Sequence, residues 1–281
     1  MSIEHPRAAD EPTAAPAYVA PPLTPDAAAP RAAPVAAAAA SNSHKLGERP
    51  LWRRLFGLAG RALRVLAIVF GLWLFAVLIA IMLYTRLDPP FTMLTAAAKL
   101  SGRTVQQVWV PLDQISPALI RAVILSEDTG FCRHLGVSLG EIEKAMEQSK
   151  DGIPRGASTI SMQLTKNLFL WPQRSYVRKA LEIPLTLAME QVLSKRRILE
   201  IYLNVAQLGP NVFGAEAAAR YHFKKPASRL VEQEAALMAA TLPAPGTRRP
   251  GRPSAMLTRL GHNLETRMRI AGGRAEACVL D

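Results

Sequence analysis

Residues 127–136 read Glu-Asp-Thr-Gly-Phe-Cys-Arg-His-Leu-Gly and directly follow an apolar segment with helical spacing. Ser116-Pro117 is typical of a helix start, so we expect a helix that ends near Ser126. The first two residues of the stretch would then lie at a helix C-terminus, where the helix dipole disfavours carboxylates. A carboxylate beside an apolar wall has its charged form disfavoured, which suits it to proton transfer. A solvated Glu-Asp pair is the plainer interpretation of this stretch alone, but the misfit with the dipole favours a functional role.

A second polar stretch occupies residues 154–167, Pro-Arg-Gly-Ala-Ser-Thr-Ile-Ser-Met-Gln-Leu-Thr-Lys-Asn. If Ser158 caps the helix that follows, Thr159, Gln163 and Lys166 lie on one face as a polar stripe ending in a cation. The free N–H groups at such a helix start can receive an anion. An ordinary solvated helix face fits this stretch equally well.

The third stretch, residues 174–182, reads Arg-Ser-Tyr-Val-Arg-Lys-Ala-Leu-Glu. Arg178 and Glu182 are one helical turn apart and can pair, and Lys179 adds charge beside them. Taken alone, an exposed ion pair is the plainer interpretation. On the same helical pattern we expect a solvated face at Glu190, Lys195, Arg196 and Arg197.

Together the three stretches resemble the motifs of the glycosyltransferase family that makes peptidoglycan glycan strands. Glu-Asp-x-x-Phe-x-x-His-x-Gly is met in full, as are Arg-Lys-x-x-Glu and a fourth motif, Arg-Ile-Leu-Glu-x-Tyr-Leu-Asn, at residues 197–204. In Gly-Gly-Ser-Thr-Ile/Leu-x-Gln-Gln-x-x-Lys-Asn, Ala157 and Met162 replace a Gly and a Gln. The resemblance covers about residues 95–245. It is closest to the monofunctional transglycosylases, because the chain has no Ser-x-x-Lys or Lys-Thr-Gly motif of a transpeptidase.

The resemblance implies a mostly α, lysozyme-like domain with two lobes and a cleft. It implies that lipid II is added to a lipid-linked glycan chain, with inversion and release of lipid pyrophosphate. Glu127 would be the general base, and Glu182 would orient Arg178, hold a divalent cation such as Mg²⁺ or Mn²⁺, or both. No tightly bound cofactor is implied. The resemblance places these residues at the substrate or in support of it: Asp128, Phe131, His134, Ser158, Thr159, Gln163, Lys166, Asn167, Arg178 and Lys179.

Residues 65–85 form an uncharged, apolar run of a length that spans a bilayer core as a helix. Arg53, Arg54, Arg61 and Arg64 precede the run, so the N-terminal side is expected in the cytoplasm and the domain in the periplasm. A cleaved signal peptide is disfavoured, because the run is long and lies deep in the chain. The single-pass anchor would sit in the inner membrane.

The chain divides into five segments by composition. Residues 1–49 are rich in Ala and Pro and are expected to be disordered, and residues 50–64 form a basic juxtamembrane segment. After the transmembrane helix, residues 86–250 form the glycosyltransferase domain and residues 251–281 a basic extension without an assigned role. Within the domain we expect one strand over 104–110. We expect helices over 158–170, over 175–203 with a kink at Pro184, over 212–222 and over 230–242, and a capping box at Ser138 and Glu141.

The formal net charge of +12 favours an anionic partner such as a phosphate or a lipid headgroup. Nucleic acid is not expected as the partner of an external domain. Cys132 and Cys278 have no metal-ligand spacing, and two cysteines carry no framework signal, so we expect neither a zinc site nor a disulfide.

Two other functions fit the same residues. A lytic transglycosylase of similar fold would also use one catalytic Glu, although a cleavage site needs no cationic pyrophosphate clamp. A non-catalytic membrane scaffold of the cell-wall machinery is the third interpretation. Besides lipid II, the expected partners are membrane lipids and other proteins of cell-wall synthesis or division. Residues 137–155 are expected to form a mobile flap at the bilayer.

Overall fold

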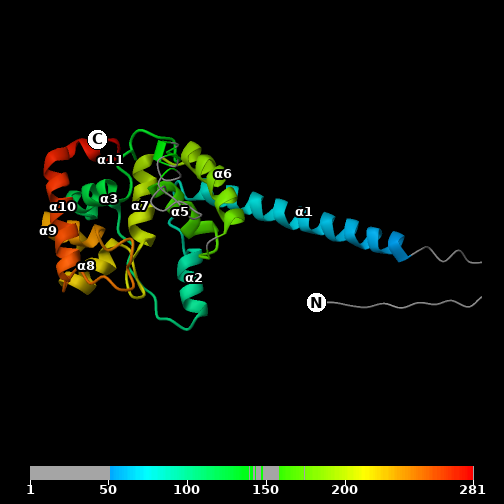
Figure 1. The fold of residues 1–281 in the computed structure, drawn as a ribbon, viewed down its shortest axis with the longest axis horizontal. Coiled ribbons are helices and arrows are strands. Elements are labelled where there is room, and N and C mark those ends of the chain that lie inside the picture. Colours follow the sequence, from blue (N-terminus) through cyan, green and yellow to red (C-terminus); the bar gives the residue numbers. More distant parts are fainter. Residues whose placement is uncertain are drawn as a thin grey trace, which may run out of the picture. The chain divides into compact units, whose positions relative to one another are not determined.

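The structure is a computed structural model that describes residues 51–138, 140, 141, 143, 147, 158–173 and 175–280. The tail at 1–49, the Ala157 replacement and most of the expected flap lie outside the described residues. Figure 1 shows a mostly helical chain, which confirms the expected fold class. The first helices along the chain are α1 (Leu51–Leu83), α2 (Met93–Leu100) and α3 (Pro117–Glu127), with a short 3-10 helix, η1, at Leu112–Gln114.

Seven further α-helices lie in the described residues from Ile160 onwards. They are α5 (Ile160–Phe169), α6 (Tyr176–Val192), α7 (Lys195–Val205), α8 (Ala215–Phe223), α9 (Glu232–Ala239), α10 (Ala255–Ala271) and α11 (Ala277–Leu280). Two 3-10 helices, η2 (Ala227–Arg229) and η3 (Gly272–Ala275), lie between them. The core is built mainly from α3, α7, α8 and α9, with α5 packed beside them, and the inward-facing side chains of these helices are almost fully buried.

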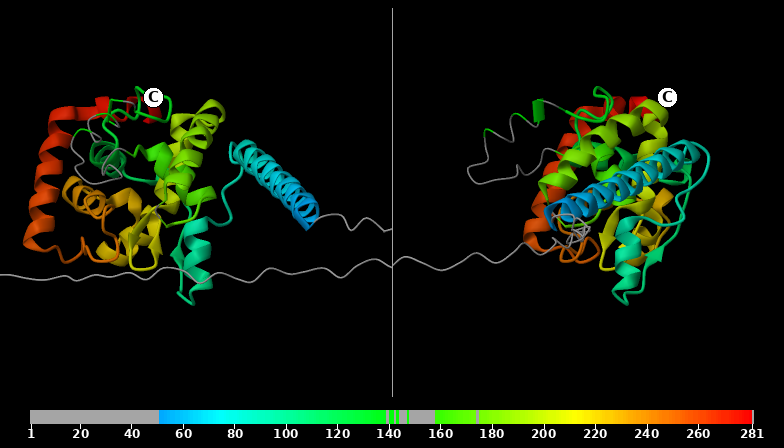
Figure 2. Two further views of the ribbon diagram at one scale, coloured as in Figure 1. Left: turned by 45° about the vertical axis from the view of Figure 1, so that its right-hand side comes forward. Right: turned by 90° about the vertical axis from the view of Figure 1, so that its right-hand side faces the viewer.

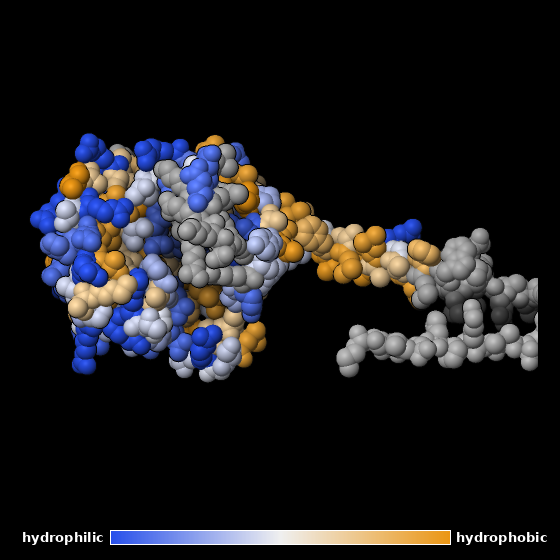
Figure 3. Space-filling model, in the orientation of Figure 1, coloured by the Kyte–Doolittle hydropathy of each residue, from blue (hydrophilic) through white to orange (hydrophobic). Residues whose placement is uncertain are grey.

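Helix α1 begins before the apolar run, at Leu51, because the arginines that precede the run are good helix formers. Its part from Leu58 to Leu83 is long and apolar enough to cross a membrane. Large apolar side chains such as Leu63 and Leu66 are 69% and 66% exposed, which a helix in a soluble core would not permit. Figure 3 shows this apolar surface along the helix.

The last turns of α1 pack against the domain. Val77 and Ile81 are buried in the common core, and the ring of Tyr84 stacks on Phe169 with centroids 6.2 Å apart. Arg197 donates to the carbonyl oxygens of Tyr84 and Leu87, at 2.8 and 2.7 Å. These bonds tie the segment that follows α1 to α7.

The helix expected over 175–203 is two helices, α6 and α7. Ser194 separates them and caps α7, since its hydroxyl accepts a hydrogen bond from the Arg197 N–H at 3.2 Å. Pro184 lies inside α6 and does not end it.

A three-stranded sheet in the order β1-β3-β2 lies beside α8. Its strands are β1 (Gln106–Gln107), β2 (Gln207–Gly209) and β3 (Val212–Phe213), with β1 parallel and β2 antiparallel to β3. The expected strand over 104–110 is therefore only two residues long. The helix expected from residue 212 starts at Ala215, because Gly214 has φ +83° and its Cα approaches the Asn204 carbonyl too closely for a Cβ.

The C-terminal segment is integrated into the fold. Helix α10 packs along α9 and α3, and α11 packs against α7 (Figures 1 and 2). Cys278 on α11 forms a disulfide with Cys132, so the expectation of unpaired cysteines is wrong. The two cysteines are 146 positions apart in the sequence, and no local pattern indicated that the fold brings them together.

Candidate active site

Glu127 is the last residue of α3, and its carboxylate is held by two neighbours. The Gln163 amide nitrogen Nε2 donates to Oε2 at 2.9 Å, and the Ser126 hydroxyl donates to Oε1 at 3.3 Å. Burial raises the pKa of Glu127 above its ordinary value of 4.5, while these two hydrogen bonds and the charge of Lys166 oppose the rise. A half-buried carboxylate with a raised pKa suits a group that accepts a proton near neutral pH.

Asp128 is tied to the protein and does not face solvent. Both of its carboxylate oxygens accept from His134 Nε2, at 2.9 and 3.0 Å, and Oδ2 also accepts from the Ile160 N–H at 3.0 Å. His134 Nδ1 accepts from the Gly136 N–H at 3.1 Å, which leaves Nε2 as the protonated nitrogen. This network closes the loop after Glu127 against the start of α5.

The start of α5 therefore receives an anion, as expected, but the anion is the carboxylate of Asp128. The cap is Thr159, not Ser158 as expected: the Thr159 hydroxyl accepts from the Met162 N–H at 3.1 Å and donates to the Gly136 carbonyl. A substrate phosphate would thus find the Ile160 and Met162 N–H groups already hydrogen-bonded within the protein. Thr159 joins the two loops and is 4% exposed.

Phe131 and Met162 serve the core. Phe131 is fully buried, with the Lys195 ammonium 4.6 Å from its ring centroid. Met162 is also fully buried, away from the polar stripe, so it replaces a Gln at a position that does not reach the cleft.

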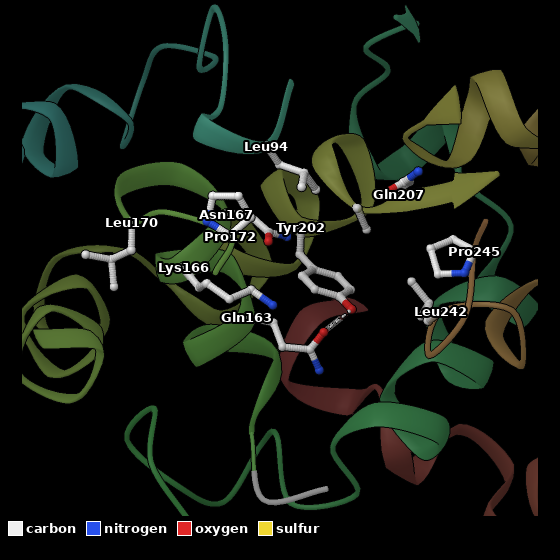
Figure 4. Close-up of a pocket in the computed structure, with 11 residues that line it drawn as sticks. Leu94, Gln163, Lys166, Asn167, Leu170, Pro172, Tyr202, Gln207, Leu242 and Pro245 are labelled. Atoms are coloured by element: carbon white, nitrogen blue, oxygen red, sulfur yellow. Dashed lines mark hydrogen bonds between the residues drawn. The ribbon is translucent and has the colours of Figure 1, made fainter. Parts of the chain in front are cut away.

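Gln163, Lys166 and Asn167 line a cavity of about 220 Å³ together with Tyr202 on α7 (Figure 4). The remaining walls are mostly apolar and come from Leu94, Leu170, Pro172, Ala206, Leu242 and Pro245, with Gln207. A second cavity, of about 160 Å³, is lined by Glu127, Asp128, Ser158, Thr159 and Arg267 among others. Gln163 connects the two, because it lines the first cavity and binds the carboxylate that lines the second.

Glu182 binds both cations of the third polar stretch, Arg178 and Lys179. Its Oε2 accepts from Arg178 Nη1 and its Oε1 from Lys179 Nζ, both at 2.8 Å. Lys179 also donates to the Ser158 hydroxyl at 3.1 Å, which links this cluster to the cavity beside Glu127. The pair expected on the surface is in fact buried, with the Glu182 side chain 2% exposed.

Arg178 lies apart from the cavities. Its guanidinium binds Glu182 and, through Nε, the Gln173 carbonyl at 3.0 Å, and it lines neither of the two cavities described above. Of the cations expected at the substrate, Lys166 lines the first cavity, and Lys179 contacts Ser158, which lines the second.

Glu190 and Lys195 do not form the solvated face that the sequence suggested. The Glu190 side chain is 2% exposed and binds Lys195 at 2.8 Å and the Ser161 hydroxyl. Arg197 is also largely buried, and only Arg196 is substantially exposed.

Sequence reasoning assigned no role to three residues at the site: Tyr202, Ser126 and Arg267. Tyr202 belongs to the fourth motif, which was a signal, but only the fold shows its hydroxyl bound to Gln163. The motif's Asn204 has a structural role, because its amide exchanges hydrogen bonds with the Val110 backbone at 2.9 and 2.8 Å. Arg267 comes from α10, in the segment that was set apart as an extension, and gave no local signal.

No group of three His, Cys, Asp or Glu side chains that could hold a metal ion is found within the described part of the chain. Glu182 alone was expected to bind a cation, and both of its oxygens already accept hydrogen bonds. The side chains around it therefore do not by themselves form a metal site.

Comparisons with known proteins agree with this arrangement. The family model described as "Transglycosylase" matches residues 94–269, and so reaches into α10. A biosynthetic peptidoglycan transglycosylase of Rhodospirillum centenum is 46% identical over 222 residues, which cover 78% of this chain and 95% of that protein. Proteins of the same name from Agrobacterium fabrum and Brucella suis are 47% and 44% identical, covering 68% and 76% of this chain and 85% and 92% of theirs. This chain therefore belongs to the transglycosylase family, with a lysozyme-like catalytic domain behind one apolar helix.

Proposed function

We propose that Glu127 is the general base of this peptidoglycan glycosyltransferase. The substrates are lipid II and a lipid-linked glycan chain. Glu127 would remove the proton from the 4-hydroxyl of the lipid II sugar as that oxygen attacks the anomeric carbon of the glycan donor. A β-1,4 bond forms with inversion, and the bond to the lipid pyrophosphate breaks. The single observation that carries this role is the half-buried Glu127 carboxylate at a cavity, held by Gln163 beside Lys166.

The leaving pyrophosphate needs positive charge as its bond to the sugar breaks. Lys166 follows Gln163 by three residues on α5 and lines the same cavity, so we assign this charge to Lys166 first. Lys179 would assist through its position beside Ser158. Arg178 would act by holding Glu182, which in turn holds Lys179.

The divalent cation at Glu182 stays a prediction. Mg²⁺ often binds one carboxylate together with substrate phosphates, but here it would have to replace Lys179 on Oε1. Chelation with EDTA followed by addition of Mg²⁺ or Mn²⁺ tests this role. Polymerisation that is indifferent to EDTA would leave Glu182 as an anchor for the two cations only.

Helix α1 makes this a membrane-anchored enzyme. We infer that it crosses the inner membrane once, with the N-terminus in the cytoplasm and the domain in the periplasm. The arginines before the apolar run support this orientation. The Cys132–Cys278 disulfide also supports it, because such bonds persist in oxidising compartments. An anchored enzyme meets lipid-linked substrates more often than a free one, and other cell-wall synthesis or division proteins would be met at the same membrane.

The test is polymerisation of fluorescent lipid II by the full chain and by Glu127→Gln. We expect the variant to lose at least about a hundredfold in rate, in line with general-base contributions. Glu265→Gln on α10, which lines neither cavity, is the matched control and should polymerise normally. Near-normal polymerisation by Glu127→Gln would remove the proposed base, and digestion of purified sacculi would instead indicate a lytic enzyme.

A further inference from the structure

Tyr202 is buried behind the Gln163 side chain and touches it with its hydroxyl. The Tyr202 residue is 1% exposed, and its hydroxyl donates to the Gln163 oxygen Oε1 at 3.1 Å. The nitrogen of the same amide donates to Glu127 at 2.9 Å. Figure 4 shows the hydroxyl and the amide oxygen joined by this hydrogen bond. A continuous relay thus runs from α7 through α5 to the end of α3.

The direction of this relay is set by chemistry. A carboxylate only accepts hydrogen bonds, so Gln163 must present its NH₂ group to Glu127. The amide oxygen then points to Tyr202, which must donate. Burial, and then the carboxylates of Glu127 and Asp128, raise the pKa of Tyr202 well above its ordinary value, so the hydroxyl keeps its proton. Without this donor the amide can turn, and its oxygen would then face the carboxylate.

We propose that Tyr202 is a positioning residue for glycosyl transfer, whose hydroxyl holds the Gln163 amide so that only its N–H group faces Glu127. The proposal rests on the role of Glu127 proposed above. It deepens that role, because it names the group on α7 that orients the amide bound to the base. Phenylalanine at this position would fill the same volume and lack only the donor.

Other charged and polar groups surround Glu127 and bear on its titration. Asp128 and Ser126 are its chain neighbours, Lys166 comes from α5, and Arg267 comes from α10. Glu141 also lines the cavity that contains Glu127. Tyr202→Phe leaves all of them unchanged, so the variant isolates the effect of the Gln163 amide.

The experiment is the pH profile of lipid II polymerisation, as kcat/KM, for the full chain and Tyr202→Phe. A less well held carboxylate needs a higher pH to ionise, so the acid limb should move to higher pH. We expect kcat/KM to fall about tenfold on the acid side of the limb, the factor that one hydrogen bond of typical strength supplies, and to recover towards the normal value at pH above the limb. Tyr221→Phe on α8, which is 39% exposed, is the control and should leave the profile unchanged.

A double variant separates positioning from packing. In a Gln163→Leu background the relay is already broken, so adding Tyr202→Phe should cost little more. The proposal is overturned if Tyr202→Phe leaves the pH profile unchanged or lowers kcat/KM equally at every pH. It is also overturned if Tyr202→Phe lowers kcat/KM as much in the Gln163→Leu background as it does alone. Failure of the proposed function shows differently, because Glu127→Gln would then remain active whatever Tyr202 does.

Discussion

Cys132 and Cys278 are joined by a disulfide across 146 residues, with their Cα atoms 5.6 Å apart. Cys132 lies five residues after Glu127, in the loop that carries the proposed base. The C-terminal segment is also held by Glu276, which binds Arg121 of α3, and by the Val279 carbonyl, which accepts from Arg196 at 2.8 Å. The end of the chain is therefore a support of the catalytic loop.

Removal of this disulfide should destabilise the domain. The cross-link closes a loop of 146 residues, for which the chain-entropy relation gives about 5 kcal/mol, with measured values for other proteins ranging from roughly 0 to 5. We expect Cys278→Ser to lower the Tm clearly and to slow lipid II polymerisation, because the loop after Glu127 loses its tie.

The double variant Cys132→Ser/Cys278→Ser is the control for reduction. Dithiothreitol should lower the Tm of the full chain towards that of the double variant and leave the double variant unchanged. Mass spectrometry should show that the protein is reduced. If the Tm of the reduced full chain is unchanged, the disulfide does not support the loop after Glu127.

Gly136→Ala should damage the catalytic loop. Gly136 has φ +87°, and a Cβ there would meet Glu190 Cγ at 2.6 Å and Thr186 Cγ2 at 3.0 Å. Both the backbone and the packing therefore resist a side chain, and we expect a loss of roughly 1–3 kcal/mol in the free energy of unfolding. The polymerisation rate should fall too, because the Thr159 hydroxyl donates to the Gly136 carbonyl and so joins this loop to α5.

Gly140→Ala offers the matched comparison for this loop. No atom of the described residues lies within 4 Å of a Cβ at Gly140, and its backbone does not have positive φ. Denaturant unfolding should place Gly140→Ala near the unchanged protein and Gly136→Ala well below it. Equal stability of the two variants would show that the loop adapts to a side chain at residue 136.

The sequence predicted the apolar helix and the helical class, because local patterns carry them. The apolar run over 65–85 and the Ser116-Pro117 helix start act over short distances, and α1 and α3 are found there. It also suggested that Glu127 is out of place at a helix end. The pKa of Glu127 is raised mainly by burial, in agreement with the apolar wall that the sequence indicated beside it.

The sequence could not predict which side chains the fold buries. Glu190 and Glu182 look like members of solvated helix faces, and only the packing of α5 on α6 encloses them. The disulfide and Arg267 depend on contacts over more than 130 residues, which no local pattern reports. Ser158 was expected as the cap of α5, but the adjacent Thr159 has that position, and its hydroxyl also donates to the Gly136 carbonyl in a contact that the local sequence does not show.

Glu127 should make stability and activity depend on pH in opposite directions. Its pKa in the folded state is raised above 4.5, so the folded protein binds the extra proton more readily than the unfolded chain in the range between the two values. The free energy of unfolding therefore falls as pH rises through that range, while activity rises as the base ionises. Glu127→Gln should be inactive yet have a higher Tm than the unchanged protein at neutral pH.

The pH dependence of the Tm gain of Glu127→Gln tests whether the gain comes from the buried charge. Below pH 4.5 Glu127 is protonated in both states, so the Tm difference between Glu127→Gln and the unchanged protein should shrink towards zero. Thermal unfolding from acidic to neutral pH measures this. A Tm gain that stays constant with pH would show that the substitution acts through packing and not through the buried charge.

Among the described residues, two Arg–Glu ion pairs at i,i+4 spacing differ in the exposure of the arginine. The Arg178 side chain is 10% exposed beside Glu182, while that of Arg220 is 64% exposed beside Glu216. Removal of one partner from a buried pair leaves an uncompensated charge, so Arg178→Ala should cost about 3 kcal/mol of stability, and Arg220→Ala less than about 1 kcal/mol. Arg178→Lys should not restore the loss, because an ammonium cannot bind Glu182 and the Gln173 carbonyl with the fixed fork of a guanidinium. Urea unfolding of the three variants measures the difference, and equal costs for Arg178→Ala and Arg220→Ala would show that Lys179 alone compensates Glu182.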